Sequence, residues 1–195
     1  MAVHPDIKSL LRESLPQYLK VAECCVSRQF GYPAAILLFS IIDTIGSYYR
    51  NNTNFTIIID GKSRQIKKDG IQHFYVLNSD YYGLNITEKQ IKKIYDNIRS
   101  LLVHNASLAP GHFLISTPGV DPFPINNTNQ CINLDALLEL SKKAVTSFIK
   151  NIDYIVPQSK QHEDIVHKAQ KQLSSNNRLE LTAALREIMR PRSSA

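Results

Sequence analysis

Apolar residues recur through most of the chain at the three- and four-residue spacing that marks one face of a helix. This spacing predicts four long helices, over residues 5–29, 33–49, 87–104 and 134–155. The second predicted helix is apolar on nearly all sides, so we expect it to be the central, most buried element. Pro16 lies inside the first predicted helix and is expected to kink or split it.

Capping residues mark where two of these helices begin. Thr87 precedes Glu88 and Gln90, a pattern typical of a helix start, and Asn133 stands directly before the fourth predicted helix. The side chain of such a residue accepts a hydrogen bond from a backbone N–H of the first turn. We therefore expect Thr87 and Asn133 to act as N-caps.

The segments between the helices carry β-like patterns. Residues 55–60 contain three consecutive isoleucines between turn signals, and residues 112–117 follow the turn Ala109-Pro110-Gly111. We expect two small β-hairpin insertions, one between the second and third helices and one between the third and fourth. Residues 72–77 are compatible with a second strand or with a short helix, and the pattern does not separate the two.

The whole pattern predicts an all-α fold, a bundle of four to five helices with these small hairpin insertions. Residues 1–157 form the predicted domain, because Pro157 ends the last strongly periodic segment. From Gln158 onward the composition is polar. Residues 158–195 are therefore expected to be a helical extension or a flexible tail, and they could bind a partner.

The composition is that of a soluble protein with a single domain, at 195 residues, 43% hydrophobic and 21% charged. Residues 1–16 carry charges where a signal peptide would be apolar. No apolar run reaches the roughly 20 residues that a membrane-spanning helix requires. We therefore expect a cytoplasmic protein without membrane contact.

The net charge is +6, from 23 Lys and Arg against 17 Asp and Glu, which is consistent with a polyanionic partner such as RNA. The charge is spread along the chain, so composition alone identifies no nucleic-acid surface. A denser basic group, Lys62, Arg64, Lys67 and Lys68, follows the first predicted strand. Two interpretations of it remain open, a basic contact loop or the solvated edge of a hairpin, where lysines are common.

Motifs that define several enzyme and metal-binding classes are missing from the sequence. It has no glycine-rich phosphate loop, no GxSxG nucleophile elbow and no dinucleotide-binding fingerprint. His162 and His167 are five residues apart, whereas the zinc-protease motif places its histidines four apart on one helical face. We expect neither a metal site nor a cofactor.

Reactive chemistry is concentrated at Arg99 and His104, near the end of the third predicted helix. Ser100 stands one α-helical turn before His104, where its hydroxyl could hold the imidazole in one orientation. With 3.6 residues per turn, Arg99 points about 140° away from His104. The two side chains could therefore border one cleft or meet across a dimer, with Asn105 directly after the histidine.

Asp43 is the one acidic residue in the apolar second helix, where Ser40, Asp43 and Ser47 form a narrow polar seam. Burying a carboxylate without a partner would cost several kcal/mol or force it to be protonated. Arg99 is the first candidate for that partner. The alternative interpretation is that Asp43 faces solvent or caps a neighbouring helix.

A helical bundle of this size, with Arg-x4-His near the end of its third long helix and a polar residue after the arginine, resembles the HEPN superfamily (higher eukaryotes and prokaryotes nucleotide-binding). The segment Arg99-Ser100-Leu101-Leu102-Val103-His104 fits the family motif. The resemblance covers residues 5–155 and does not extend to the polar end of the chain.

Many HEPN proteins are metal-independent endoribonucleases that work as homodimers, with two motifs in one cleft. The resemblance implies that His104 is a general acid or base at the ribose 2′-OH or the leaving 5′-oxygen, and that Arg99 stabilises charge on the phosphate. Ser100, Asp43 and Asn105 would be supporting residues. It also implies RNA as the substrate, 2′,3′-cyclic phosphate products and a role in toxin–antitoxin systems, antiphage defence or RNA processing.

Two further points follow from the same resemblance. HEPN toxins that are silenced by adenylylation carry a tyrosine two residues after the motif histidine, where this chain has Ala106. Control by an antitoxin that modifies that position is therefore not expected, although an antitoxin or another protein could still bind. Some HEPN proteins are non-catalytic modules that bind a nucleotide or a protein partner, and this is the alternative function.

Overall fold

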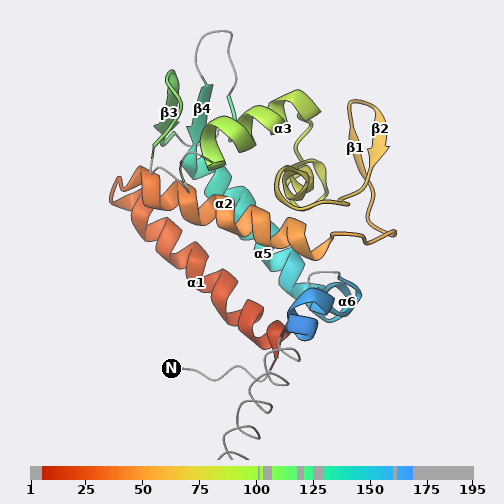
Figure 1. The fold of residues 1–195 in the computed structure, drawn as a ribbon. Helices are drawn as coiled ribbons and strands as arrows, with labels where there is room; N and C mark the ends of the chain where they lie inside the picture. Colours follow the sequence, from red (N-terminus) through yellow and green to blue (C-terminus); the bar gives the residue numbers. More distant parts are fainter. Residues whose placement is uncertain are drawn as a thin grey trace, which may run out of the picture.

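The computed structural model describes residues 6–100, 102, 107–117, 121–124, 130–159 and 162–168, and it is mainly helical over these ranges (Figure 1). The α-helices are α1 (Ile7–Ser27), α2 (Gly31–Tyr48), α3 (Glu88–Ile94), α5 (Leu134–Lys150) and α6 (Ile152–Ile155). The described residues also form two 3-10 helices, η1 (Gly70–Asn78) and η3 (Val156–Gln158), and a π-helix, η2 (Tyr95–Ser100). The strands are β1 (Ile57–Ile59), β2 (Lys62–Arg64), β3 (His112–Ile115) and β4 (Gln130–Asn133), and residues 162–168 are helical. The prediction of a mainly helical fold is confirmed.

Helix α2 is the central element, as its apolar sequence predicts. It packs against α1, α5 and η1 (Figure 1). Phe39 of α2 stacks on Phe74 of η1 and on Phe123, with ring centroids 5.9 and 6.4 Å apart, and Tyr48 meets Phe148 of α5 at 6.0 Å. All five rings are buried, and each contributes about 1.5–3 kcal/mol to the stability of the core.

Three local signals in the sequence bear on where the helices begin and end. Helix α1 continues through Pro16, so the proline does not split it. Thr87 caps α3 in a capping box with Gln90, as predicted. Asn133 occupies the N-cap position of α5, as predicted, but its side chain makes no capping hydrogen bond. This fully buried amide instead bonds both the carbonyl and the N–H of Thr117, at 2.7 and 3.3 Å.

The third predicted helix is not α-helical throughout, because α3 ends at Ile94 and continues as the π-helix η2. The hydrogen bonds of a π-helix join residues i and i+5, so each of its turns holds more residues than a turn of an α-helix. A period of 3.6 residues therefore does not hold around Arg99. The predicted angle of about 140° between Arg99 and His104 assumes that period, so η2 removes the basis for it, and His104 itself lies outside the described residues.

Of the two predicted hairpins, one is confirmed and one is wrong. Strands β1 and β2 are antiparallel, whereas β3 and β4 pair in parallel. A parallel pair needs a connection of about a dozen residues or more, and the chain between Ile115 and Gln130 is long enough to provide it. Residues 72–77, which the pattern left open, belong to the 3-10 helix η1.

The part of the predicted extension that the structure describes is short. Helix η3 leads into Ser159, which is fully buried, and residues 162–168 form one more helical segment. The rest of residues 158–195 lies outside the described residues, so the predicted domain boundary stays a prediction. No helix among the described residues is both long and apolar enough to cross a lipid bilayer.

Helix α2 and η1 approach each other most closely at Gly46. A Cβ atom at this position would lie 2.2 Å from the backbone oxygen of His73, a distance that real Cβ atoms do not reach. Only glycine lets two backbones come this close. Because Gly46 is three residues after Asp43, it lies on the same side of α2, and the close approach brings His73 beside Asp43.

We expect Gly46→Ala to destabilise the protein, because the new Cβ would have to displace the backbone of η1. Overpacking of this kind costs about 1–3 kcal/mol, and we expect the upper end of that range in urea unfolding. Gly31→Ala is the matched control in α2, since its Cβ would meet the movable Leu114 Cδ1 at 3.1 Å. Equal losses in the two variants would show that the close approach is not the cause.

Candidate functional site

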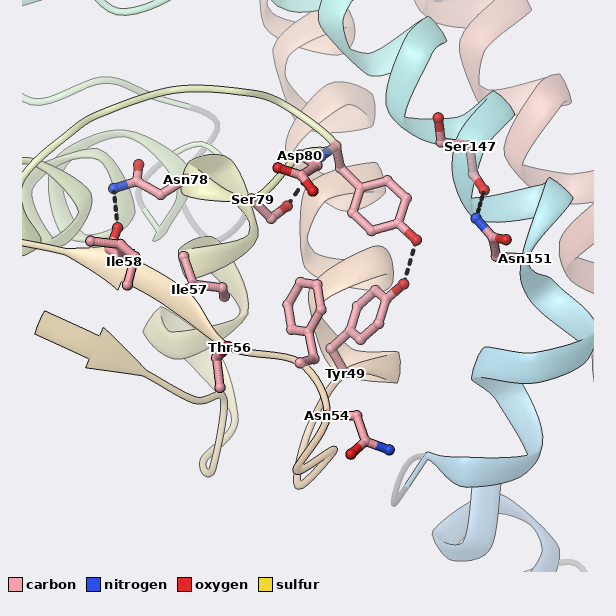
Figure 2. Close-up of a pocket in the computed structure, with 12 residues that line it drawn as sticks. Tyr49, Asn54, Thr56, Ile57, Ile58, Asn78, Ser79, Asp80, Ser147 and Asn151 are labelled. Atoms are coloured by element: carbon pink, nitrogen blue, oxygen red, sulfur yellow. Dashed lines mark hydrogen bonds between the residues drawn. The ribbon is translucent and has the colours of Figure 1, made fainter.

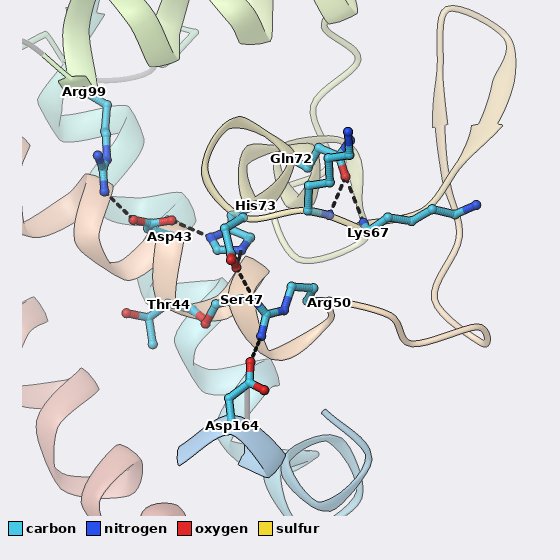
Figure 3. Close-up of polar contacts among 11 residues, drawn as sticks. Asp43, Thr44, Ser47, Arg50, Lys67, Gln72, His73, Arg99 and Asp164 are labelled. Carbon is cyan, nitrogen blue, oxygen red and sulfur yellow. Dashed lines mark hydrogen bonds and ion pairs between the residues drawn. The ribbon is translucent and has the colours of Figure 1, made fainter. Parts of the chain in front are cut away.

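The carboxylate of Asp43 in α2 contacts two basic side chains from other elements (Figure 3). Nη2 of Arg99 donates a hydrogen bond to Oδ2 at 2.6 Å, and Nδ1 of His73 lies 2.7 Å from Oδ1. We call these three residues the Asp43 cluster. The predicted pairing of Asp43 with Arg99 is confirmed, whereas the part played by His73 was not predicted.

The guanidinium group of Arg99 is also held by an aromatic ring of its own helix. Its central carbon lies 5.3 Å from the ring centroid of Tyr95, which is within the range of a cation–π contact. Tyr95 in turn meets Phe74 edge to face at 5.4 Å, and Gly70 of η1 leaves room for the Tyr95 hydroxyl. The π-helix therefore places a ring and a guanidinium together on the side that faces η1 and α2.

Asp43 is ionised in this setting. Burial by itself would raise its pKa, but the hydrogen bond from His73 and the positive charge of Arg99 lower the pKa below its ordinary value of 3.8. An ionised carboxylate can only accept hydrogen bonds. Nδ1 of His73 therefore carries a hydrogen and donates it to Asp43.

The members of the Asp43 cluster differ in how much solvent reaches them. The side chains of Arg99 and Asp43 are 19% and 24% exposed, whereas that of His73 is 8% exposed. A shallow cavity of about 290 Å³ opens beside the cluster and is lined by Ser40, Asp43, Thr44, Ser47 and His73. Asp43 and His73 thus contribute to the wall of this cavity, whereas Arg99 is not among its lining residues.

The polar seam predicted in α2 is present, although its members behave differently. The hydroxyls of Ser40 and Ser47 donate to the carbonyl oxygens of Ile36 and Thr44, at 2.8 and 2.7 Å, both within α2. Asp43 instead bonds side chains of η1 and η2. The seam therefore joins α2 to its neighbours through the carboxylate.

The remaining predicted site residues are only partly placed. Ser100 is the last residue of η2 and is half-buried. His104 and Asn105 lie outside the residues that the structure describes. The structure therefore brings Arg99 and Asp43 together, and the relation of both to His104 stays a prediction.

His73 is the site residue that the sequence analysis missed. It lies in a short 3-10 helix whose apolar neighbours, Phe74 to Leu77, give no hint of a polar contact. The sequence signal that could have led to His73 is Gly46, a glycine inside an apolar helix. It stands three residues after Asp43, the one acidic residue of that helix. Such a glycine marks a close backbone approach, and the approaching segment was the place to look for a second partner of Asp43.

The basic group near the first hairpin divides into two pairs. Lys62 and Arg64 belong to β2, so this pair fits the interpretation as a hairpin edge. Nη2 of Arg64 lies 2.9 Å from a carboxylate oxygen of Glu88 in α3. Lys67 and Lys68 follow the hairpin and are exposed. Their backbone N–H groups both donate to Oε1 of Gln72, at 2.8 Å, so this loop is fixed to η1 just before His73 (Figure 3).

A second cavity, of about 570 Å³, is drawn in Figure 2 and shares no lining residue with the cavity beside the Asp43 cluster. Its aromatic wall contains Tyr49 and Tyr81, whose hydroxyls are hydrogen-bonded, and Phe55, which stacks on Tyr49 at 3.7 Å. Asp80 and Asn151 contribute to its polar lining. Among the described residues, its lining holds no Lys, Arg or His and no member of the Asp43 cluster, so these residues offer no cation to a phosphate.

Within the described ranges, no group of three or more His, Cys, Asp or Glu side chains is arranged to hold a metal ion. Comparison of the chain with protein-family models, with curated proteins and with solved structures finds no match. The function therefore has to be inferred from the Asp43 cluster and the residues around it.

We expect Asp43→Asn to lower the free energy of unfolding at neutral pH, because Arg99 loses a charged partner in a partly buried place. The loss should be about 2 kcal/mol in urea unfolding. The pKa of Asp43 is lowered in the folded state, so its contribution is present above pH 3.8 and disappears as the pH falls through the folded value. The wild-type and variant curves should therefore converge in acid.

Asp153→Asn is the control for that measurement, since Asp153 pairs with Lys8 and Arg12 on the surface and its side chain is 66% exposed. Its replacement should have a smaller effect than that of Asp43. A difference between wild type and Asp43→Asn that stays constant down to the acid transition would contradict the role of the ionised carboxylate.

Proposed function

We propose that this chain is a metal-independent endoribonuclease of the HEPN type, with a HEPN-like helical bundle, that cleaves RNA in the cytoplasm. The observation that carries the proposal is the fixed and partly exposed guanidinium of Arg99, the arginine of the Arg-x4-His motif. Its location in a π-helix adds support, because π-helical segments are frequent at functional sites.

Arg99 binds the phosphate at which RNA is cut. It donates one hydrogen bond to the described residues, through Nη2, whereas a guanidinium has five N–H donors in a fixed plane. The donors not used by Asp43 are available to the non-bridging phosphate oxygens. Because Asp43 and Tyr95 already orient the group, it stabilises the charge that develops on these oxygens without rearranging during the reaction.

His104 supplies the proton transfers. The ribose 2′-oxygen loses its proton to a base and attacks the adjacent phosphorus, the bond from phosphorus to the 5′-oxygen breaks, and that oxygen receives a proton. A histidine acts as base or acid in such steps and contributes about 10²–10⁴-fold in rate. The products are a 2′,3′-cyclic phosphate and a 5′-hydroxyl, with Ser100 and Asn105 as supporting residues.

The exposed pair Lys67 and Lys68 gives the RNA strand a place to bind near the Asp43 cluster. Both residues lie in a loop that Gln72 fixes to η1, the element that carries His73. Contacts between lysine and the phosphate backbone provide affinity without sequence preference. The net charge of +6 acts in the same direction over the whole chain.

The proposal includes a homodimer that joins two Arg-x4-His motifs in one cleft. Because η2 is a π-helix, the angle predicted between Arg99 and His104 does not support this dimer. Its support is the family resemblance. An antitoxin or another protein partner would bind this assembly, in toxin–antitoxin systems, antiphage defence or RNA processing.

The alternative proposal is a non-catalytic HEPN module that binds a nucleotide or a protein partner. The observation that favours it is that Arg99 is already neutralised by Asp43, which weakens its pull on a phosphate. The two functions differ in a simple respect, because only the enzyme changes the length of the RNA.

We expect the purified protein to cut single-stranded RNA in the presence of EDTA and to leave 2′,3′-cyclic phosphate ends, measured by gel electrophoresis and mass spectrometry. Arg99→Ala and His104→Ala should each lower the rate by about 10²-fold or more. Arg12→Ala, which removes an exposed arginine paired with Asp153, should have no effect. RNA that stays intact in every condition while still being bound would favour the non-catalytic module.

A second measurement tests the shared cleft. When Arg99→Ala and His104→Ala subunits are mixed and allowed to exchange, mixed dimers contain one intact arginine and one intact histidine. We expect part of the cleavage activity to return on mixing, because the two residues can then meet across the two-fold axis. Subunits that exchange, as judged by mass spectrometry, but remain inactive would show that each motif works alone.

A further inference from the structure

The polar contacts of the Asp43 cluster continue beyond His73. The second ring nitrogen of His73, Nε2, lies 3.4 Å from Oδ1 of Asp69, the residue directly before η1. Asp69 is paired with Nη1 of Arg50, and Nη2 of Arg50 is paired with Asp164 (Figure 3). Arg99, Asp43, His73, Asp69, Arg50 and Asp164 thus form one continuous series, which we call the charge chain.

Arg50 joins the last member of the charge chain, Asp164, to the rest of it. It follows the end of α2, and its side chain is only 11% exposed. A guanidinium buried to this degree is strongly destabilising without acidic partners. One of its two acids, Asp164, comes from the helical residues 162–168, so this segment is tied to the end of α2 that is nearest the Asp43 cluster.

Basic and acidic side chains alternate along the charge chain, so each member lies next to a side chain of the opposite type. Asp43 faces Nδ1 of His73 and Asp69 faces Nε2, so a carboxylate lies at each side of the imidazole. Nε2 is buried and makes no hydrogen bond to the described residues, so its contact with Asp69 is attractive only when the imidazole is protonated. The hydrogen bond that orients the imidazole is therefore the one from Nδ1 to Asp43, and Asp69 lies close to the other side of the ring.

We infer that His73 is a positioning residue for Arg99, and that docking of residues 162–168 through Asp164 helps to hold that position. Nδ1 of His73 is bonded to Asp43 and Nε2 is buried, so neither ring nitrogen is open to RNA. It binds Oδ1 of Asp43, which leaves Oδ2 facing Arg99. The effect on cleavage rests on the proposed function, whereas the effect on the arginine does not.

Matched variants separate positioning from general support of the fold. His73→Asn keeps an N–H donor near the place of Nδ1, whereas His73→Leu fills a similar volume without a donor. Asp164→Asn removes the charge at the far end of the charge chain. Asp153→Asn is its control, because Asp153 also pairs with an arginine distant in sequence but lies outside the charge chain.

The first readout is the ¹⁵N NMR signal of the Arg99 guanidinium, assigned by its absence in Arg99→Lys. We expect a sharp signal in wild type, in His73→Asn and in Asp153→Asn. It should broaden or shift in His73→Leu and shift less in Asp164→Asn. An Arg99 signal that is the same in folded His73→Leu and in wild type overturns the positioning role, and identical signals in Asp164→Asn and Asp153→Asn overturn the docking part.

The second readout is RNA cleavage. We expect His73→Leu to lower kcat by about 10- to 100-fold with little change in KM, whereas His73→Asn should keep most of the wild-type kcat.

If wild type cuts no RNA but the NMR signals follow the expected pattern, the positioning role stands and the proposed function fails. If RNA is cut and neither kcat nor the Arg99 signal responds to the His73 variants, the positioning role fails alone. If His73→Leu does not fold, Asp164→Asn and His73→Asn still test the inference. Loss of the Arg99 signal in His73→Asn would contradict the role of the Nδ1 donor.

Discussion

An ionised carboxylate within an otherwise apolar helix is the constraint on which the candidate site depends. Asp43 is tolerable in α2 only because basic groups from η1 and η2 reach both of its oxygens. Three segments that are separate in sequence are thereby fixed relative to one another. Gly46 supplies the steric counterpart, since the absence of a side chain lets the backbone of η1 come close enough for His73 to reach Asp43.

The features that could be predicted from sequence are those with local signals. The periodic apolar residues of α1 and α5 mark one face of each helix, the nearly continuous apolar residues of α2 mark a central helix, and Thr87 with Gln90 marks the start of α3. The pairing of Asp43 with Arg99 was predictable for a different reason. A buried charge needs an opposite one, and Arg99 was the prominent basic residue on a neighbouring predicted helix.

The features that could not be predicted depend on contacts between distant segments. His73 gives no pattern in its own helix, and its role arises only when η1 packs on Gly46. The π-helix η2 escapes any analysis that assumes 3.6 residues per turn. Strands β3 and β4 have ordinary strand sequences, and their parallel pairing is decided by the path of the chain between them.

The order in which the chain can fold follows from the sequence separations within the charge chain. Asp43 is 30 residues from His73 and 56 from Arg99, and Arg50 is 114 residues from Asp164. Closing such long loops is entropically unfavourable, so these contacts form after the more local packing of α1 on α2. During synthesis Asp164 is also the last member to leave the ribosome. The packing of α1 on α2 thus precedes the charge chain, which is incomplete in a nascent chain until Asp164 has left the ribosome.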